Sequence, residues 1–202
     1  MSIEEKLGDL FDRWKAEQLR GKVDLGLDIS WRFTPDGIVG EEEAYLNAPV
    51  KVLYILKEGN LTERADMPAE QAGRFDFWFK RIVATGEPHK IKRRIEDMQK
   101  IITGSDDLTV TAHMNLNKAG GLASTDMKKL RAYATAPGIA PLIREEIKLL
   151  APDVIVCGGC YGIVAEILGA DAPYRMVDMW HPSHRVTDAA YREKFKNEWE
   201  GQ

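Results

Sequence analysis

The chain has 202 residues, which is the usual size of one domain and too short for two large ones. Hydrophobic residues make up 44% and charged residues 30%, a balance that excludes a disordered chain and is typical of a protein that buries a core. No apolar stretch approaches the roughly 20 residues of a membrane helix, and the first residues lack the pattern of a secretory signal. We therefore expect a single cytoplasmic domain without a membrane partner.

The net charge of −4 argues mildly against a nucleic-acid partner, but the charges are unevenly distributed. Residues 1–50 hold 6 basic and 11 acidic residues, whereas residues 74–100 hold 8 basic and 4 acidic ones. The basic residues are densest at Lys80–Arg81 and over 89–94. Two interpretations remain open: a surface that binds phosphates, or a solvated helix face whose charge is balanced elsewhere.

Helical and strand patterns alternate along the chain. A capping box at Ser2 and Glu5, followed by apolar residues at helical spacing, predicts a first helix within residues 1–30, which we treat as an N-terminal helical extension. Further helices are predicted over 41–46, 71–84 and 91–102, before Leu150, after Gly158–Gly159, and around Tyr191–Trp199.

Four apolar segments read as strands, over residues 50–56, 107–113, 153–157 and 175–179. Strands separated by helices need crossover connections, and buried strands need cover on both faces. The fold predicted for residues 1–202 is therefore a single three-layer α/β/α domain with a central, mainly parallel, four-stranded sheet.

Polar residues follow each predicted strand. In open parallel sheets, ligands bind at the carboxyl ends of the strands, because the connecting loops and helix N-termini meet there. We therefore expect one functional site, built from residues 57–60, 113–118, 157–160 and 180–185.

Glu58 is the only carboxylate directly after the first predicted strand. A carboxylate there can orient or deprotonate water, or bind a ribose hydroxyl or a cation; the alternatives are helix capping and an ion pair with Lys57. Asn60 has the same ambiguity, since its amide can bind a base edge or belong to a turn.

Asn115 and Asn117 follow the second predicted strand. We expect one amide to point into the site and the other to make a backbone or capping bond, and both assignments remain open. The adjacent Gly120–Gly121 would allow a ligand to approach the backbone closely.

His181 and His184 form the strongest pair of candidates. A histidine can donate to an oxygen that gains negative charge, and Ser183 with nearby backbone amides can bind a phosphate. The alternative is a structural loop that Pro182 fixes and Ser183 caps. A zinc site is the least favoured interpretation, because two further ligands are not evident.

Phe77 lies between Arg74 and Arg81 on a predicted helix, away from its apolar stripe. This arrangement can stack a base and bind its phosphate. The alternative is a partly buried Phe77 with arginines whose aliphatic stems cover apolar surface.

Cys157 and Cys160 lie between a strand and a helix, where a helix N-terminus lowers a thiol pKa and favours thiol–disulfide exchange. The alternative is a glycine turn flanked by two small, buried residues. Two cysteines cannot supply the four thiolates of a typical iron–sulfur cluster.

With these segments placed, the chain resembles a divergent branch of the uracil-DNA glycosylase superfamily over residues 31–185. The His-Pro-Ser sequence is the most specific element, because the second motif of the family begins with it. The segment at residues 57–60 lacks the proline of the family's first motif, and His184–Arg185 replaces its usual continuation. The resemblance rests on residues 52–60 (VLYILKEGN), Asn115 and Asn117, residues 152–159 (PDVIVCGG) and His181-Pro182-Ser183.

The resemblance implies an enzyme without a cofactor that flips a damaged base out of DNA and hydrolyses its N-glycosidic bond. It implies that His181 stabilises the departing base, that Ser183 contacts a phosphate, and that Glu58 or Asn60 positions water. It also implies that Asn115 or Asn117 reads the base edge. His184, Arg185, Arg74 and Arg81 are the further phosphate candidates, and Phe77 is the stacking candidate.

Two rival functions are carried alongside this interpretation. The first is a nucleotide- or nucleic-acid-binding protein that keeps the pocket without hydrolysis. The second is a thiol–disulfide redox protein that uses Cys157 and Cys160.

Overall fold

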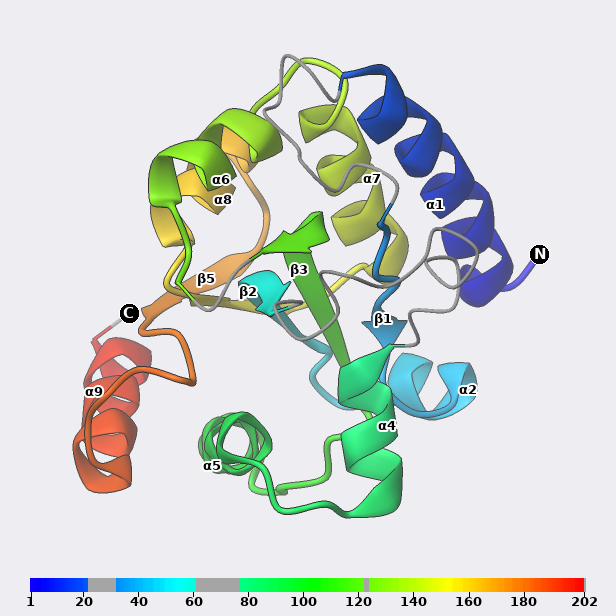
Figure 1. Ribbon diagram of the computed structural model, residues 1–202. Coiled ribbons are helices and arrows are strands. Elements are labelled where there is room, and N and C mark those ends of the chain that lie inside the picture. The colour runs from blue at the N-terminus through cyan, green and yellow to red at the C-terminus, as the bar shows by residue number, and fades with distance from the viewer. Residues whose placement is uncertain (22–31, 61–76, 122–123, 202) are drawn as a thin grey trace.

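The computed structural model describes residues 1–21, 32–60, 77–121 and 124–201, and within these ranges helices cover both faces of one sheet (Figure 1). The strand order is β1-β3-β2-β4-β5. Strands β3, β2, β4 and β5 are parallel, and β1 pairs antiparallel with β3 at one edge. The strands are β1 Gly37–Ile38, β2 Val52–Asn60, β3 Thr111–Gly121, β4 Val154–Gly158 and β5 Arg175–Met179.

The α/β class and the mainly parallel sheet are confirmed, but the predicted number of strands was wrong. The sheet has five strands rather than four because β1 lies in a stretch that reads as a turn. A strand of two residues has no room for the alternating pattern that identifies longer strands. Only its pairing with His113 and Ala112 of β3 reveals it.

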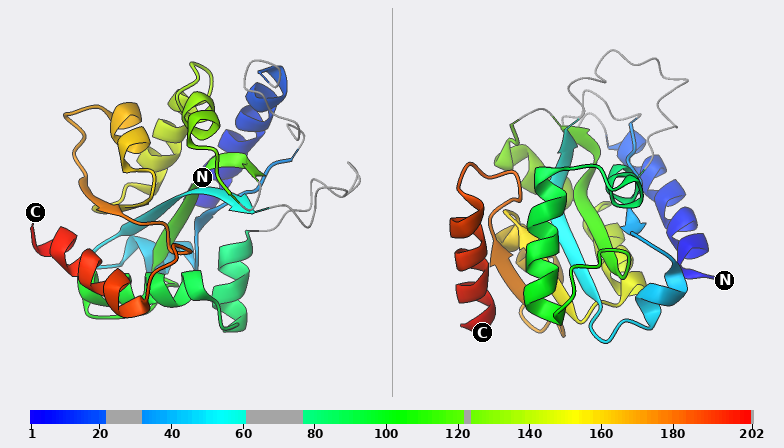
Figure 2. Two further views of the ribbon diagram at one scale, coloured as in Figure 1. Left: turned by 60° about the vertical axis from the view of Figure 1, so that its left-hand side comes forward. Right: turned by 90° about the horizontal axis from the view of Figure 1, so that it is seen from below.

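Two helical layers enclose the sheet, and Figure 2 shows them from two further directions. The helices of the α1 layer are α1 Ile3–Arg20, α6 Met127–Ala134, α7 Ala140–Leu150 and α8 Tyr161–Leu168. Those of the α5 layer are α4 Trp78–Thr85, α5 Lys90–Thr103 and α9 Asp188–Glu200. The short helix α2, Glu42–Leu46, lies between β1 and β2 in the chain.

The central strand β2 is apolar on both faces because both faces are covered. Leu53 and Ile55 belong to the core beneath the α1 layer, whereas Val52 and Tyr54 belong to the core beneath the α5 layer. Alternate side chains of a strand point to opposite faces, so a continuous apolar run is needed at this position.

Helix α1 begins with the predicted capping box, in which Ser2 and Glu5 each accept a hydrogen bond from the backbone of the other. Its buried face contributes Leu7, Leu10, Phe11 and Trp14 to the core. No described helix combines the length and the hydropathy that crossing a membrane requires.

The strands β2 and β3 continue beyond their apolar segments, and their predicted ends were wrong. The parallel register pairs Glu58 with Asn117 and Asn60 with Gly121, with a shift between Glu58 and Asn60. Backbone hydrogen bonds do not depend on side-chain polarity, so the ladder extends past the apolar run. The polar residues expected in loops, among them Glu58 and Asn117, therefore lie within paired strands.

A buried lysine connects β3 to the segment before β1 and to helix α7. The Lys118 side chain is fully buried and forms ion pairs with Asp36 and with Glu146, whose Oε2 lies 2.9 Å from Nζ. Asp36 also accepts a hydrogen bond from the backbone N–H of Asn115 at 2.6 Å. Burial raises the pKa of Glu146 well above its ordinary value. The lysine thus fixes β3 against the residue before β1 and against α7.

We predict that Lys118→Met lowers the free energy of unfolding by about 3–5 kcal/mol, because it leaves Asp36 and Glu146 buried without a counter-charge. Urea denaturation measures this change. The control is Lys15→Met, which removes the exposed pair with Asp12 and should cost less than about 1 kcal/mol. Similar losses in the two variants would contradict the role of the buried cluster.

Candidate functional site

The strand β3 places His113, Asn115 and Asn117 on the face of the sheet that carries the α5 layer. His113 contacts the aromatic rings at the start of α4, and Asn117 bonds to Glu58 on the neighbouring strand. The residues between them pack on the opposite face, beneath the α1 layer, namely Ala112, Met114 and Leu116. Both predicted amides therefore share one face.

Asn117 makes the backbone bonds expected of one of the two amides. Its Nδ2 donates to the Gly120 carbonyl and to Oε2 of Glu58, both at 3.0 Å, and its Oδ1 accepts from the Ala119 N–H at 3.0 Å. A Cβ at Gly121 would lie 2.2–2.6 Å from the Glu58 carboxylate, so a side chain there would displace it. Asn117 and Gly121 together hold the carboxylate at the end of β2.

Asn115 is the other amide, and it is left with an unused donor. The residue is 2% exposed, and its Nδ2 is buried without a hydrogen-bond partner among the described residues. A buried donor without a partner costs about 1–3 kcal/mol, so its presence in a folded protein calls for an explanation, such as a ligand that accepts its hydrogen bond. Asn115 lies beside Leu56 of β2, two residues along each strand from the pair of Glu58 and Asn117.

His113 is a second buried polar side chain on this face; the sequence placed it in the expected segment 113–118 but gave no reason to single it out. Within the described chain, neither ring nitrogen has a hydrogen-bond partner. The ring stacks on Phe79 at 4.6 Å, and the rings of Phe77 and Trp78 lie 5.8 and 5.9 Å away. Burial lowers the pKa of His113 to about 3, so the imidazole is neutral at physiological pH.

His181 follows β5 and starts the sequence His-Pro-Ser. Its Nδ1 accepts a hydrogen bond from the backbone N–H of Ser183 at 3.2 Å and lies 2.7 Å from Ser183 Oγ. Because a backbone N–H only donates, the proton of the neutral imidazole must be on Nε2. Burial, together with the charges of Lys57 and His184, lowers the pKa of His181 to about 4. The ring is therefore a neutral Nε2–H donor.

Glycines bring the segment of His181 against the ends of β2 and β4. A Cβ at Gly159, whose φ is +74°, would lie 3.5 Å from the Cβ of His181 and 3.8 Å from Cδ of Lys57. A Cβ at Gly158 would lie 3.2 Å from Cδ of Pro182 and 2.5 Å from Cδ2 of Leu56. The three segments are therefore in close contact.

The carboxyl ends of β3, β2, β4 and β5 form one edge of the sheet, which we call the C-terminal edge (Figure 2). Asn115 and Asn117 stand on β3, Glu58 on β2, and His181 directly after β5. Three strand spacings of about 4.8 Å separate the strand of Asn115 from the strand that leads to His181. This edge thus combines an amide donor, a carboxylate and a neutral imidazole.

The remaining candidates of the His-Pro-Ser segment lie at the surface. Ser183, His184 and Arg185 are exposed, and the ring of His184 lies 5.2 Å from that of Trp180. Ser183 uses its hydroxyl and its N–H to hold His181. The described residues contain no cluster of three or more potential metal ligands.

The predicted aromatic face between two arginines is only partly described. Phe77 is the N-cap residue of α4 and is half-buried, so it does not lie within a helix as predicted. Arg81 is exposed on α4. Arg74 lies outside the described residues. Asn60 ends β2, where its backbone pairs with Gly121.

The basic residues of α5 pair within the fold. Lys92 forms an ion pair with Glu96, and Arg93 with Asp188 of α9. Lys90 donates to the carbonyl of His184. These contacts favour the interpretation in which acceptors elsewhere in the chain balance the basic cluster.

Cys157 and Cys160 are both buried and do not form a disulfide. The Cys160 thiol donates to the carbonyl of Ile55 at 3.3 Å. The hydrogen bond with Cys160, together with burial, raises the pKa of Cys157. Because the thiolate is the reactive form, this environment favours the packing role over thiol–disulfide exchange.

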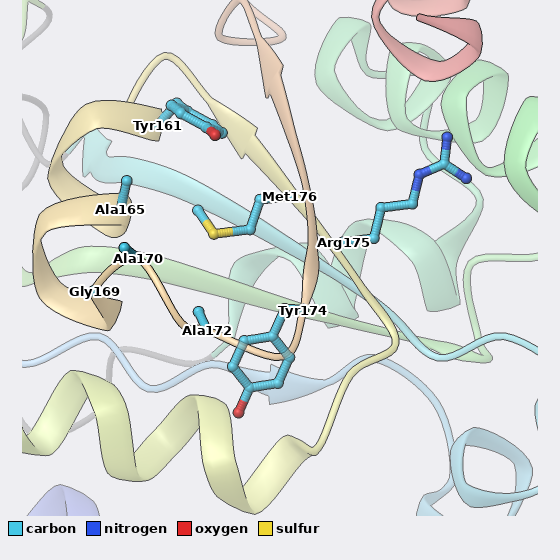
Figure 3. A pocket seen from close by; sticks show the side chains of 8 residues that line it. All are labelled: Tyr161, Ala165, Gly169, Ala170, Ala172, Tyr174, Arg175 and Met176. Atoms are coloured by element: carbon cyan, nitrogen blue, oxygen red, sulfur yellow. The ribbon is translucent and has the colours of Figure 1, made fainter. Parts of the chain in front are cut away.

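A depression of 940 Å³ lies between α8 and the start of β5 (Figure 3). Its lining does not include Glu58, Asn115, Asn117 or His181. Within the described chain, the buried polar atoms that lack partners are not on its lining residues. Arg175 stacks over Trp199 at 3.4 Å and points away from the other side chains in Figure 3. The C-terminal edge is therefore the stronger candidate. The lining residues are Tyr161, Ala165, Gly169, Ala170, Ala172, Tyr174, Arg175 and Met176.

Comparison with known proteins gives no further evidence about this site. No protein-family model matches the chain, and no curated protein sequence matches it. The functional argument therefore rests on the residues of the site.

We predict that the stability of the protein falls with decreasing pH because His113 is buried in its neutral form. Its pKa is about 3 when folded and 6.5 when unfolded, so the unfolded chain binds the proton first as the pH falls through this window. Between pH 7 and pH 5 this group should cost about 2 kcal/mol of unfolding free energy. The variant His113→Phe keeps the aromatic packing and removes the titration.

Urea denaturation of both proteins at pH 7 and pH 5 checks this expectation. The loss between the two pH values should be about 2 kcal/mol smaller in His113→Phe, while His181 contributes equally to both. Equal losses would contradict the burial of a neutral imidazole at position 113.

Proposed function

We propose that the protein is a hydrolase of the uracil-DNA glycosylase type, which cleaves the N-glycosidic bond of a damaged or deaminated base in DNA. The observation that carries the proposal is the buried Nδ2 of Asn115, which has no partner among the described residues. A carbonyl oxygen or ring nitrogen of a base would accept its hydrogen bond. Such a contact would offset the cost of burying the donor.

His181 supplies the group that the departing base requires. When the glycosidic bond breaks, the electron pair stays with the base, and its oxygen becomes negative. A neutral imidazole with its proton on Nε2 can donate to that oxygen as the charge develops. The hydrogen bonds from Ser183 to Nδ1 support this tautomer.

Glu58 is the candidate for positioning water. In the proposed reaction, water adds to the sugar carbon, its proton passes to the carboxylate, and the bond to the base breaks. Asn117 and Gly121 restrict the position of this carboxylate from the side of β3. Asn60, at the end of the same strand, is the second candidate for this role.

The surroundings provide groups for the rest of a nucleic-acid substrate. Extruding a base costs a few kcal/mol, which stacking and phosphate contacts partly offset. Phe77 is half-buried next to His113 and is the stacking candidate. The exposed His184, Arg185 and Arg81 are the phosphate candidates, and the reaction needs no cofactor.

A second candidate function is binding of a nucleotide or nucleic acid without hydrolysis. One observation favours it: residues 57–60, which correspond to the family's first motif, continue strand β2 rather than form a loop, and they lack the usual proline. The Glu58 carboxylate already accepts a bond from Asn117. Both functions require the amide of Asn115, and only the first requires chemistry at Glu58 and His181.

We predict that His181→Ala lowers turnover about 100-fold or more and changes oligonucleotide affinity little, because its bond strengthens only as charge develops on the base. The assay uses single- and double-stranded oligonucleotides that contain uracil, hypoxanthine or xanthine, followed by alkaline cleavage of abasic sites. Ser183→Ala keeps the N–H bond to Nδ1 and should lose less activity.

The same assay separates the two candidate functions. Strand cleavage that depends on His181 supports the glycosylase. Oligonucleotide binding that falls steeply with salt, without cleavage of any of these substrates, overturns it in favour of binding alone. Equal losses of turnover and affinity in His181→Ala would contradict the proposed role of the imidazole.

We predict that Asn115→Leu abolishes recognition of the base without destabilising the fold. Because Nδ2 is buried without a partner among the described residues, its removal should not lower the free energy of unfolding and should raise it by up to about 1–3 kcal/mol. Affinity for an oligonucleotide with the preferred base should fall to its value for an undamaged one. The control is Asn197→Leu on the exposed face of α9, and a loss of stability confined to Asn115→Leu would indicate a structural role.

A further inference from the structure

One buried arginine holds the segment that carries His181. We call residues 180–187 the His181 loop. Arg94 of α5 is 0% exposed, although arginine is among the residues least often buried. Its guanidinium donates to three backbone carbonyl oxygens of this loop, at 3.0 Å in Pro182, 2.8 Å in His184 and 2.6 Å in Val186.

Helix α9 completes the surroundings of Arg94. Its Nε donates to Oδ1 of Asp188 at 2.8 Å, and its guanidinium carbon lies 4.4 Å from the ring centre of Tyr191. The hydroxyl of Tyr191 donates at 2.7 Å to the carbonyl of Trp180, the residue before His181. The His181 loop is thus bonded to α5 and α9 on both sides of the imidazole.

Only an arginine satisfies this set of acceptors. Four hydrogen bonds spread over Nε, Nη1 and Nη2 need a planar group with donors in several directions. A lysine has three donors on a single atom, so it would leave carbonyl groups of the loop without partners. A buried cation is tolerated only when its hydrogen bonds are made, so the loop conformation and Arg94 depend on each other.

We propose that Arg94 is the positioning residue of the candidate site: it holds the His181 loop in the conformation that bonds Ser183 to Nδ1 of His181. The catalytic consequence rests on the proposed function, whereas the placement of the imidazole does not. The proposal also gives a role to two of the basic residues of α5. Arg94 and Lys90 face the carbonyl groups of a loop rather than the phosphates of a ligand.

The test compares Arg94→Lys with Arg93→Lys. Arg93 bonds to the other oxygen of the same Asp188 from an exposed position, so it is a matched control. NMR titration of the histidine ring signals, without DNA, measures the pKa of His181. In Arg94→Lys, this pKa should rise from about 4 toward 6.5, because a loosened loop admits water to the imidazole.

Turnover gives the second readout. A misplaced donor lowers kcat more than it changes KM, so Arg94→Lys should lose about tenfold or more in kcat with KM within about threefold. Arg93→Lys should leave both values and the titration of His181 unchanged. A folded Arg94→Lys protein with the wild-type titration and the wild-type kcat would overturn the proposal.

Asp188→Ala serves if Arg94→Lys does not fold, because it removes the acceptor of Arg94 Nε, which orients the guanidinium toward the carbonyl groups of the loop. It should shift the pKa of His181 in the same direction, and an unchanged titration would overturn the proposal. If the wild-type protein releases none of the tested bases, the proposed function fails, while the titration still decides the role of Arg94.

Discussion

The parallel register of β2 and β3 fixes the candidate site, and the buried Lys118 fixes that register. Side chains alternate along a strand, so a slip of one residue would turn every side chain of β3 to the other face. Such a slip would take Lys118 away from Asp36 and Glu146 and leave three charged groups buried without partners. The register that satisfies the lysine on one face also places Asn117 beside Glu58 on the other. The ion pairs therefore determine the position of the polar groups at the C-terminal edge.

Two groups of buried polar side chains lie on opposite faces of β3, and they differ in how many of their hydrogen bonds are made. On the α1 side of the sheet, Lys118 meets two carboxylates. On the α5 side, His113 and Asn115 retain polar atoms without partners among the described residues. These atoms lie two residues apart on one strand, so they share one face. Other buried atoms without partners among the described residues, such as Thr34 Oγ1 and Gln99 Nε2, lie on separate segments, whereas His113 and Asn115 are neighbours on one strand. Orphan polar groups cost stability, and under the proposed function a bound molecule would complete the hydrogen bonds of this pair.

The sequence predicted those features that depend on apolar side chains. The runs at 52–56 and 154–157 identify central strands because both faces of these strands are covered. It did not predict where β2 and β3 end, because backbone pairing continues where apolar cover stops. The candidates Glu58, Asn115 and His181 follow from their places after strands, whereas the burial of His113 depends on aromatic rings from a distant helix. The burial of Arg94 could have been predicted from its position in the helix, although its charge suggests an exposed residue. Arg94 is three residues from Ile91 and four from Met98, on the apolar face of its helix.

Different contacts hold the two halves of the candidate site in place, and the distance between the halves depends on the residues that lie between them. The amides and Glu58 stand on paired strands, while the imidazole depends on side chains of α5 and α9. Between these halves lies the end of β4, where Gly158 faces Leu56 and Pro182 and Gly159 faces His181 and Lys57. A Cβ at Gly158 would be only 2.5 Å from Cδ2 of Leu56 and 3.2 Å from Cδ of Pro182, so a side chain there would displace Leu56 and press on the His181 loop. The close approach of β2 and the His181 loop at the end of β4 thus depends on two glycines, and a larger residue there would disturb the site even if every polar group remained.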